Sequence, residues 1–462
     1  DQIMSEQVTR RQFLGTSGKA AATLAAGAAV HTMLRPARAA DANEKFNVAL
    51  IGCGGMGGAN LNSFMNTELV NVVAVCDVDQ NHLGNRVQQA EAKLGKKPEA
   101  VKDYRKVIDR KDVDVVIVAT PDHWHAAPMI AAVAAGKDVY CEKPACHNIA
   151  EGRAMVDAAA KYRRIVQVGT HQRSAAHMQE ARDFIRAGKL GTITMTETYT
   201  WGNEAPDGMG NAPDEPSPEG LDYDMWLGAA PKRPFNRRRF HHSFRWYFDY
   251  ASGMVGDWNV HLQDIIMWTL ETPSPKEVST SGGKFVLPDD RDTPDTMLAT
   301  YEFGPGPHTP SGYVQLYTMR KASGPPWSHG GYGMVFHGTN GKLLMRRDSW
   351  EVVGDFKDWG DPNKGRRVEG FNKPGVDQHL DHVKNFLACV RSRQKPIASI
   401  EDHFQTVTAC HLANVSLRSG SKIYWCTKTE KCYKDPELKT PDAVANQYVT
   451  REYRKGYELP KV

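Results

Sequence analysis

Short apolar runs alternate with segments of helical apolar spacing between Phe46 and Thr170. A short apolar run bounded by turn residues is typical of a strand buried on both faces, and an apolar residue at every third or fourth position indicates an amphipathic helix. The predicted strands cover 48–52, 70–76, 112–120, 137–141 and 165–168. One predicted helix begins at Gly57, and three others cover 80–94, 124–135 and 149–162. This alternation predicts a doubly wound parallel sheet, which is an α/β fold.

The pattern changes after Thr170. Residues 201–250 are rich in proline, glycine and aromatic residues and show little periodicity. Residues 277–345 contain several strand-like segments with no helix between them. The helical spacing returns at 377–418, and residues 425–462 form a polar tail. This order predicts a second domain of the α+β class, built on a large and mostly antiparallel sheet.

Length and charge narrow the class of protein. The chain has 462 residues, which is too long for one ordinary hydrophobic core and suggests two domains. Its 58 basic and 54 acidic residues leave a net charge of +4. So small a surplus predicts neither a nucleic-acid partner nor an anionic membrane partner. The 8 cysteines do not make a disulfide scaffold in a chain of this length, and only Cys426 and Cys432 are candidates for a bridge.

The first forty residues read as a targeting segment. Arg10 and Arg11 stand in the stretch Thr-Arg-Arg-Gln-Phe-Leu, which precedes a weakly apolar, alanine-rich run and then Ala37-Arg38-Ala39. This order resembles a twin-arginine export signal with an A-x-A cleavage site at the end of residues 1–40. We therefore expect a periplasmic or otherwise exported protein. No other stretch approaches the eighteen or so apolar residues of a membrane span, so none is expected.

A glycine motif ends the first predicted strand and carries the most specific signal in the chain. The motif is Gly52-x-Gly54-x-x-Gly57, and Asp77 ends the second strand twenty residues later. Gly52 permits a tight turn, Gly54 lets the backbone approach a pyrophosphate, and Gly57 lets the helix sit close to its strand. The predicted dinucleotide contacts include the intervening Cys53, Gly55 and Met56. A carboxylate at Asp77 binds ribose hydroxyls and repels a 2′-phosphate, which favours NAD over NADP.

Two further places carry residue types suited to catalysis. Glu142-Lys143-Pro144 follows the fourth strand, which puts Lys143 at the carboxyl edge of a parallel sheet, where ligands of such folds bind. A lysine there can donate to a hydroxyl or carbonyl oxygen. Asp257 and His261 are four residues apart on a predicted helix and share one face. His261 could take a hydroxyl proton with Asp257 orienting it, although such pairs are often only structural.

In order and spacing, these motifs resemble the glucose-fructose oxidoreductase and inositol dehydrogenase family, often called Gfo/Idh/MocA. The resemblance includes the segment Ala-Thr-Pro-Asp-His-Trp-His at 119–125 and covers the chain from Phe46 to its C-terminus. It implies an N-terminal Rossmann domain at 41–170 and a substrate-binding α+β domain at 171–462. It implies that Lys143, Asp257 and His261 are catalytic. The residues it places at the cofactor are Thr120, Pro121, His123, His125, Glu142 and Lys143.

The resemblance also bears on subgroup, assembly and substrate. Segments 168–173 and 221–228, together with Ala445-Asn446 before Arg451, resemble an exported bacterial subgroup. Pairing through the sheet of the second domain, as a homodimer or homotetramer, is implied. Aromatic, basic and acidic residues of the second domain suit a sugar or polyol, and packing within a loop-rich region explains any single one of them equally well. The predicted substrate residues are His171, Arg173, Trp226, Arg245, Trp246, Asp249, Asp257 and His261. The histidine and aspartate spacings match no recognised zinc or calcium motif, so we predict no metal.

Three functions follow as hypotheses. The favoured one is an NAD(P)-dependent oxidoreductase that transfers a hydride between a tightly bound nicotinamide cofactor and a sugar, polyol or sugar derivative. The alternative is an NAD-dependent glycoside hydrolase that works by transient oxidation, elimination, hydration and re-reduction, with Tyr247, Tyr250 or His171 as a second base. A non-catalytic sugar-binding protein on the same fold is the third. Because free NAD is not expected to be replenished outside the cytoplasm, the cofactor would be loaded before export and regenerated in the catalytic cycle.

Overall fold

The structure is a computed structural model that describes residues 45–325, 330–375 and 378–462. The predicted export segment, residues 1–40, lies outside the described residues. A search of the described helices finds none that is long and apolar enough to cross a membrane.

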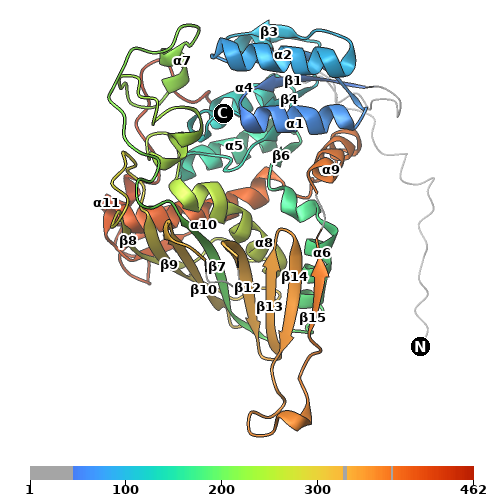
Figure 1. The fold of residues 1–462 in the computed structure, drawn as a ribbon, viewed down its shortest axis with the longest axis vertical. Coiled ribbons are helices and arrows are strands. Elements are labelled where there is room, and N and C mark those ends of the chain that lie inside the picture. The colour runs from blue at the N-terminus through green and yellow to red at the C-terminus, as the bar shows by residue number, and fades with distance from the viewer. Residues whose placement is uncertain (1–44, 326–329, 376–377) are drawn as a thin grey trace, which may run out of the picture. The chain divides into compact units, whose positions relative to one another are not determined.

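The N-terminal half folds as the predicted doubly wound sheet (Figure 1). Its six strands lie in the order β3-β2-β1-β4-β5-β6, and every pairing is parallel. The strands are β1 (Phe46–Ile51), β2 (Val70–Cys76), β3 (Glu99–Val101), β4 (Val115–Val118), β5 (Asp138–Cys141) and β6 (Val166–Val168). The helices are α1 (Gly55–Asn66), α2 (Gln80–Leu94), α3 (Tyr104–Asp109), α4 (Ala126–Ala134) and α5 (Ile149–Tyr162). All four residues of β4 are buried, as a central parallel strand requires.

Two short elements of this half were not predicted. β3 has only 3 residues, of which two are exposed, and α3 has 6 residues with only Val107 buried. Neither has enough apolar positions to show a period of two or of 3.6. β3 gains its hydrogen bonds by pairing with β2, and the sequence pattern of β3 did not predict this pairing.

The second half is built on a mixed, mostly antiparallel sheet of 11 strands, as predicted. Its order is β15-β14-β13-β12-β7-β10-β9-β8-β16-β17, with β11 paired to β7. Among the described strands of this sheet, only the pairing of β10 with β7 is parallel. The strands are β7 (Ile193–Asn203), β8 (Glu277–Gly283), β9 (Thr296–Phe303), β10 (Tyr313–Arg320), β11 (Ala322–Ser323), β12 (Tyr332–Gly338), β13 (Gly341–Arg346), β14 (Ser349–Gly354), β15 (Phe371–Pro374), β16 (Ile423–Cys426) and β17 (Lys431–Tyr433).

Among the described residues, helices cover one face of this sheet, and side chains on the other face are exposed. The helices of this half are α6 (Ala176–Arg186), α7 (Tyr223–Leu227), α8 (Val260–Leu270), α9 (His379–Ser392), α10 (Ile400–Ser419) and α11 (Ala443–Asn446). Burial alternates along β10, where Tyr313, Tyr317 and Met319 are buried and Val314 is exposed. This alternation is what a sheet with one covered face requires. The buried side packs against α8 and α10.

α9 completes the core of the N-terminal half, although it lies within the segment predicted to belong to the second domain. Its side chains Val383, Phe386 and Leu387 join the core cluster that contains Phe64 of α1. The Phe386 ring lies 6.1 Å from the Phe64 ring in an edge-to-face arrangement. Figure 1 shows α9 beside α1 and β6. The helical spacing of apolar residues predicted the helix α9 but did not indicate which core it joins.

The predicted polar tail is more ordered than expected. β16 and β17 extend the large sheet, and Arg451 and Arg454 return to the N-terminal half and the segment beside it. The sequence did not predict these strands because they are too short to show a pattern; β16 gains its bonds from β8, and β17 gains its bonds from β16. Cys426 and Cys432 are free thiols. Cys432 pairs with Trp425 across the hairpin, so its side chain and that of Cys426 point to opposite faces.

Candidate active site

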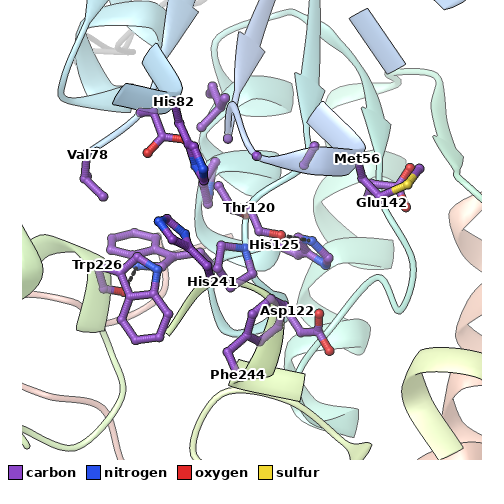
Figure 2. A pocket seen from close by; sticks show the side chains of 18 of the residues that line it. Met56, Val78, His82, Thr120, Asp122, His125, Glu142, Trp226, His241 and Phe244 are labelled. Carbon is purple, nitrogen blue, oxygen red and sulfur yellow. Dashed lines mark hydrogen bonds between the residues drawn. The ribbon is translucent and has the colours of Figure 1, made fainter. Parts of the chain in front are cut away.

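A cavity of about 590 Å³ lies at the carboxyl ends of the parallel strands. Figure 2 shows it from close by. Ten of the predicted cofactor residues line it: Gly52, Gly54, Gly55, Met56, Asp77, Thr120, Pro121, His125, Glu142 and Lys143. The predicted substrate residues Trp226 and Arg245 line it too. The cavity is therefore shared between the two halves of the chain.

The glycine loop has the geometry that its motif predicts. Gly52 has a φ of +93°, and a Cβ there would lie 2.5 Å from the carbonyl carbon of Ala119, so no other residue fits. A Cβ on Gly57 would collide with the carbonyl oxygen of Gly52. By contrast, a Cβ on Gly54 would meet only His82, at 3.9 Å. The backbone at Gly54 is thus open to the cavity at the N-terminus of α1, which fits a pyrophosphate.

Asp77 is held in place by backbone donors. Its Oδ2 accepts from the backbone N–H of Cys53 at 2.6 Å, and its Oδ1 accepts from that of Asp79 at 2.8 Å. Burial raises the pKa of Asp77, and these two hydrogen bonds oppose that rise. Cys53 itself is buried beneath the loop, so its backbone rather than its thiol serves the site. A fixed acceptor at the end of β2 fits the hydroxyls of a ribose.

Lys143 follows β5 and points to the second half of the chain. Its Nζ donates to the backbone oxygen of Asp257 at 2.6 Å and to Oδ1 of the same residue at 2.9 Å. Arg245 Nε donates to the same Oδ1 at 3.1 Å. Burial by itself would raise the pKa of Asp257, but the charges of Lys143 and Arg245 hold that pKa below its usual value. The ammonium group is therefore anchored beside the cavity by an ionised carboxylate.

His261 lies in the first turn of α8 and is 4% exposed. Its Nδ1 has no hydrogen-bond partner among the described residues, and its ring lies 5.7 Å from that of His171. Burial, followed by the charges of Lys143 and His171, lowers the pKa of His261 well below its usual value. The imidazole is thus neutral at pH 7, and a neutral imidazole can accept a proton.

Asp257 and His261 are not related as the sequence predicted. A π-helix at Val255–Asn259 interrupts the regular helical spacing just before α8. The Asp257 carboxylate is bound to Lys143 and Arg245, and no described hydrogen bond joins it to His261. Asp257 therefore orients Lys143 rather than His261. Such π-turns often occur at functional sites, and a period-based prediction cannot detect one.

Glu142 links the cavity to α1 and α9. Its Oε1 accepts from Asn60 Nδ2 at 2.9 Å, and its Oε2 accepts from the backbone N–H of Lys143 at 3.2 Å. Asn60 Oδ1 in turn lies 2.9 Å from His379 Nε2. Sequence reasoning missed Asn60 and His379, because one lies within α1 and the other 319 positions further along the chain.

Two segments of the second half, residues 220–228 and 241–246, form what we call the cover of the cavity. Backbone hydrogen bonds join it to the N-terminal half, from Asp222 N to Val78 O and from Gln80 N to Gly220 O, both at 3.1 Å. Trp124 Nε1 donates to Trp226 O at 2.9 Å. In Figure 2, His241 lies directly below His82, with 4.2 Å between the two ring centres, and Trp226 and Phe244 lie further below.

Side chains reinforce the cover at both ends. His241 Nε2 lies 2.9 Å from Asp79 Oδ2. His241 has a φ of +50°, a conformation that only the surrounding contacts can maintain in a residue with a Cβ. At the other end, Arg454 Nε donates to Gly228 O at 2.8 Å and Nη1 to Asp224 at 2.6 Å. The cover is therefore fixed to both the nucleotide-binding half and the C-terminal segment.

Comparison with known proteins decides the family. Residues 46–170 match the model of an oxidoreductase family with an NAD-binding Rossmann fold, named GFO_IDH_MocA, and residues 176–285 match the model of the C-terminal alpha/beta domain of the same family. The chain belongs to the Gfo/Idh/MocA oxidoreductase family. Its N-terminal half is the NAD-binding domain of that family, which agrees with the glycine loop and Asp77.

Relatives within the Gfo/Idh/MocA family differ in activity. Over 148 residues the chain is 33% identical to inositol 2-dehydrogenase of Salmonella typhimurium, covering 32% of the chain and 43% of that protein. Over 182 residues it is 34% identical to a glycosyl hydrolase family 109 protein of Saccharopolyspora erythraea, covering 36% and 39%. The chain thus spans less than half of each of these relatives. Levoglucosan dehydrogenase in complex with NADH and L-sorbose shares the fold, with a TM-score of 0.60 at 20% identity over 82% of this chain and 98% of that one.

The structure places several predicted site residues away from the cavity. Arg173 is 2% exposed and forms a bidentate pair with Asp264, Nε to Oδ2 and Nη2 to Oδ1, both at 2.7 Å. Trp246 is buried below the guanidinium of Arg291, 5.7 Å from the ring centre. Asp249 pairs with Arg233 at 2.7 Å. These side chains are occupied by protein partners, which their sequence neighbourhood did not reveal.

The predicted cofactor residue His123 is buried, with its Nε2 2.9 Å from the backbone oxygen of Trp226, and it supports the cover instead of lining the cavity. His171 lies beside His261. Asp122, which was not predicted, does line the cavity. Burial raises the pKa of Asp122 to about 7 against the opposing charges of Arg245 and Lys143.

The cover brings together one group of possible metal ligands. Ligand atoms of Asp79, His82 and His241 all lie within 4.8 Å of one another. The sequence spacing did not show this group, because His241 is 162 positions from Asp79. The hydrogen bond between His241 and Asp79 accounts for two of its members, and the absence of a metal stays a prediction.

Proposed function

We propose that the chain is an NAD-dependent oxidoreductase that transfers a hydride between a retained nicotinamide cofactor and a hydroxyl-bearing carbon of a sugar or polyol. The observation that carries this proposal is the anchoring of Lys143 by Asp257 beside the cavity, with the neutral His261 close by. Bound NAD would supply the hydride acceptor. Gly52, Gly54 and Asp77 would hold it, because their geometry leaves the loop open and presents a fixed carboxylate.

The side chains divide the remaining work between them. Lys143 donates to the substrate oxygen and stabilises the negative charge that develops there as the C–H bond weakens. Asp257 keeps the ammonium group oriented, with Arg245 as its second cation. His261 accepts the hydroxyl proton, which its lowered pKa permits at pH 7. In the reverse direction the same groups return the proton to the oxygen.

The cover supports retention of the cofactor between turnovers. Its backbone and side-chain hydrogen bonds to Val78, Asp79, Gln80 and Trp124 close the cavity from the side of the second domain. These bonds hold Trp226, His241 and Phe244 against the cavity that they line. Retention would also suit an exported enzyme, which cannot draw on a cytoplasmic NAD pool.

A second candidate is redox-neutral glycoside hydrolysis on the same site. Two observations favour it: the similarity to glycosyl hydrolase family 109 proteins and the position of His171 beside His261. In this chemistry the sugar is oxidised, His171 removes the acidified neighbouring C–H proton, the aglycone leaves, water adds and the hydride returns. Tyr250 packs against Trp226 and His123, and no described hydrogen bond or ring contact joins Tyr247 or Tyr250 to His261, which favours His171 for this part.

The test begins with denaturing the purified full chain and identifying any released nucleotide by mass spectrometry and absorbance. Stoichiometric NAD or NADH supports retention, and an empty protein contradicts it. Sugars, sugar pairs and glycosides are then supplied without added NAD. Bleaching or appearance of absorbance at ~340 nm with product formation supports the oxidoreductase. Aglycone release without net NADH supports the hydrolase, and sugar binding without either product supports the non-catalytic alternative.

We propose that the protein is exported by the twin-arginine route, on the strength of the Arg10-Arg11 pair and the alanine-rich run that follows. Replacing both arginines by lysine should leave a folded reporter in the cytoplasm. Export of the doubly substituted chain would contradict the proposal.

We also propose that copies of the chain pair through the open face of the large sheet. Leu298, Val314 and Val353 are 45%, 47% and 48% exposed on β9, β10 and β14. Light scattering should report a dimer or tetramer that Val314→Asp weakens. A monomer at all concentrations would refute it.

A further inference from the structure

A group of side chains beside Asp257 is not used by the proposed chemistry. Trp258 follows Asp257 directly and is 39% exposed, which is unusual for a tryptophan next to a buried charge. The ring of Tyr332 on β12 meets it edge to face, with 5.1 Å between ring centres. The guanidinium of Arg347 lies 5.5 Å from the Trp258 ring and 5.8 Å from the Tyr332 ring. We call these three residues the aromatic-arginine group.

This group is connected to the reaction centre. Gln172 Nε2 donates to the Tyr332 hydroxyl at 2.6 Å, and the neighbouring His171 lies 5.7 Å from His261. The buried Gln172 Oε1 and His261 Nδ1 have no partner among the described residues. Both residues are more than nine-tenths buried, at 1% and 4% exposure.

The fold places Arg347 at the end of the large sheet that lies nearest α8. Arg347 stands on the turn between β13 and β14, which lies at the end of the sheet nearest α8 in Figure 1. The loop between β14 and β15 extends from the opposite end. The charge of Arg347 is among those that lower the pKa of both His171 and His261. Arg347 is therefore close enough to act on a molecule held by His261.

The described carboxylates near the reaction centre have other partners and do not form an ion pair with the Arg347 guanidinium. Asp257 pairs with Lys143 and Arg245, and Glu142 accepts from Asn60 and from the backbone of Lys143. The neighbouring Asp348 accepts from Ser349, and its charge acts on His177. Within the described parts of the chain, no carboxylate lies at ion-pair distance from Arg347, whose side chain is exposed.

We infer that Arg347 binds the anionic group of an acidic sugar whose ring lies against Trp258 and whose reacting hydroxyl lies at Lys143 and His261. A carboxylate is the group that suits a guanidinium fork best, because both of its oxygens can accept in one plane. The exposed face of Trp258 suits the C–H face of a sugar ring. This inference rests on the proposed function and narrows its substrate class to sugar acids.

The test compares acid and neutral sugars of the same stereochemistry. NAD-loaded full-length protein is titrated calorimetrically with glucose and glucuronate, galactose and galacturonate, and mannose and mannuronate. We expect at least one acid to bind about tenfold or more tightly than its neutral partner, and Arg347→Ala to remove that ratio while Arg347→Lys keeps part of it. Glucose 6-phosphate tests whether a phosphate ester serves equally as the anion.

Arg366→Ala is the matched control. Arg366 also lies over an aromatic ring, that of Phe356 at 4.4 Å, but on the loop at the opposite end of the sheet. It should leave the acid-to-neutral ratio unchanged. The inference is overturned if no acid in any series binds more tightly than its neutral partner, or if the preference survives in Arg347→Ala.

The proposed function is judged separately, by NADH absorbance. Arg347-dependent binding of an acid without NADH formation supports the inference and counts against the oxidoreductase. NADH formation from neutral sugars, with no preference for acids that Arg347→Ala removes, supports the oxidoreductase and overturns the inference.

Discussion

Replacing Lys143 by methionine removes the ammonium group but keeps an unbranched side chain of similar length. Two hydrogen bonds are lost, from Nζ to the backbone oxygen of Asp257 and to its Oδ1. The donor that faces the substrate oxygen is lost with them. Turnover and stability should therefore both fall, but for different reasons and by different amounts.

The loss of turnover is the larger effect. Removing one donor to a developing oxyanion reduces kcat by roughly 10²–10³, or about 2.7–4 kcal/mol. The loss of stability is smaller, because Asp257 keeps Arg245 at 3.1 Å and is not left as an unpaired buried charge. A hydrogen bond to a charged group contributes about 1.5–3 kcal/mol. Asp257 has a lowered pKa in the folded state, so this stability is present at pH 7 and is lost as pH falls below about 4.

The assay follows NADH absorbance and product in protein purified with its nucleotide. Nucleotide content, measured by mass spectrometry, should not change, since neither the glycine loop nor the cover uses Lys143 Nζ. Lys137→Met is the matched control, because Lys137 precedes β5 at the other edge of the sheet and its Nζ donates to Val113 O at 3.1 Å. The control should lose stability and keep its turnover. A Lys143→Met protein with more than about a tenth of wild-type turnover would refute the role of Lys143.

Three further predictions test the site and its support. Gly52→Ala should yield protein without nucleotide by mass spectrometry, because Gly52 has a φ of +93° and a Cβ there would clash with Ala119. The control is Gly84→Ala on α2, where a Cβ meets nothing within 4 Å, and this variant should retain the nucleotide. Full nucleotide content in Gly52→Ala would contradict this account of the loop. Arg173→Met should lower the free energy of unfolding by about 3–5 kcal/mol, because it leaves Asp264 buried and unpaired. The KM of the folded protein should change little. A raised KM at unaltered stability would show instead that Arg173 binds the substrate. Burial lowers the pKa to about 3 for His123 and His403 and to about 4 for His125, His382 and His411. Acid should destabilise the fold between pH 6.5 and 4, because these histidines bind protons there in the unfolded chain and stay neutral in the folded one. Each contributes up to about 1.4 kcal/mol per pH unit, and the raised pKa of Asp122 offsets part of the sum; denaturant unfolding that shows level or rising stability over that range contradicts the prediction.

Local rules account for the elements that the sequence predicted well. The predicted helices at 80–94 and 149–162 coincide with α2 and α5, whose N-caps Asp79 and Asn148 accept from the first-turn backbone. Caps, apolar periods and glycine conformations depend on a few neighbouring residues. The turn at Gly52 is of the same kind, since its positive φ is required by the loop itself.

Long-range contacts decided which candidate residues reach the site. Arg173 and Trp226 looked equally suited to a sugar, yet Arg173 is paired with Asp264 and Trp226 lines the cavity. Arg347 gave no signal, because its position beside Trp258 depends on the register of β13 and β14. A local sequence pattern cannot show that Arg347 lies beside Trp258, because the two residues are 89 positions apart in the chain.

The sequence by itself determined the dinucleotide loop, the acidic end of β2, the parallel sheet and the lysine at its edge, because each follows from the spacing of nearby residues. Only the tertiary structure decided that α9 completes the first core, that Asp257 anchors Lys143 rather than His261, and that the cover lines the cavity. Burial and ion pairing are properties of whole packed surfaces. They are set when distant segments exclude water together, and that requires the complete fold.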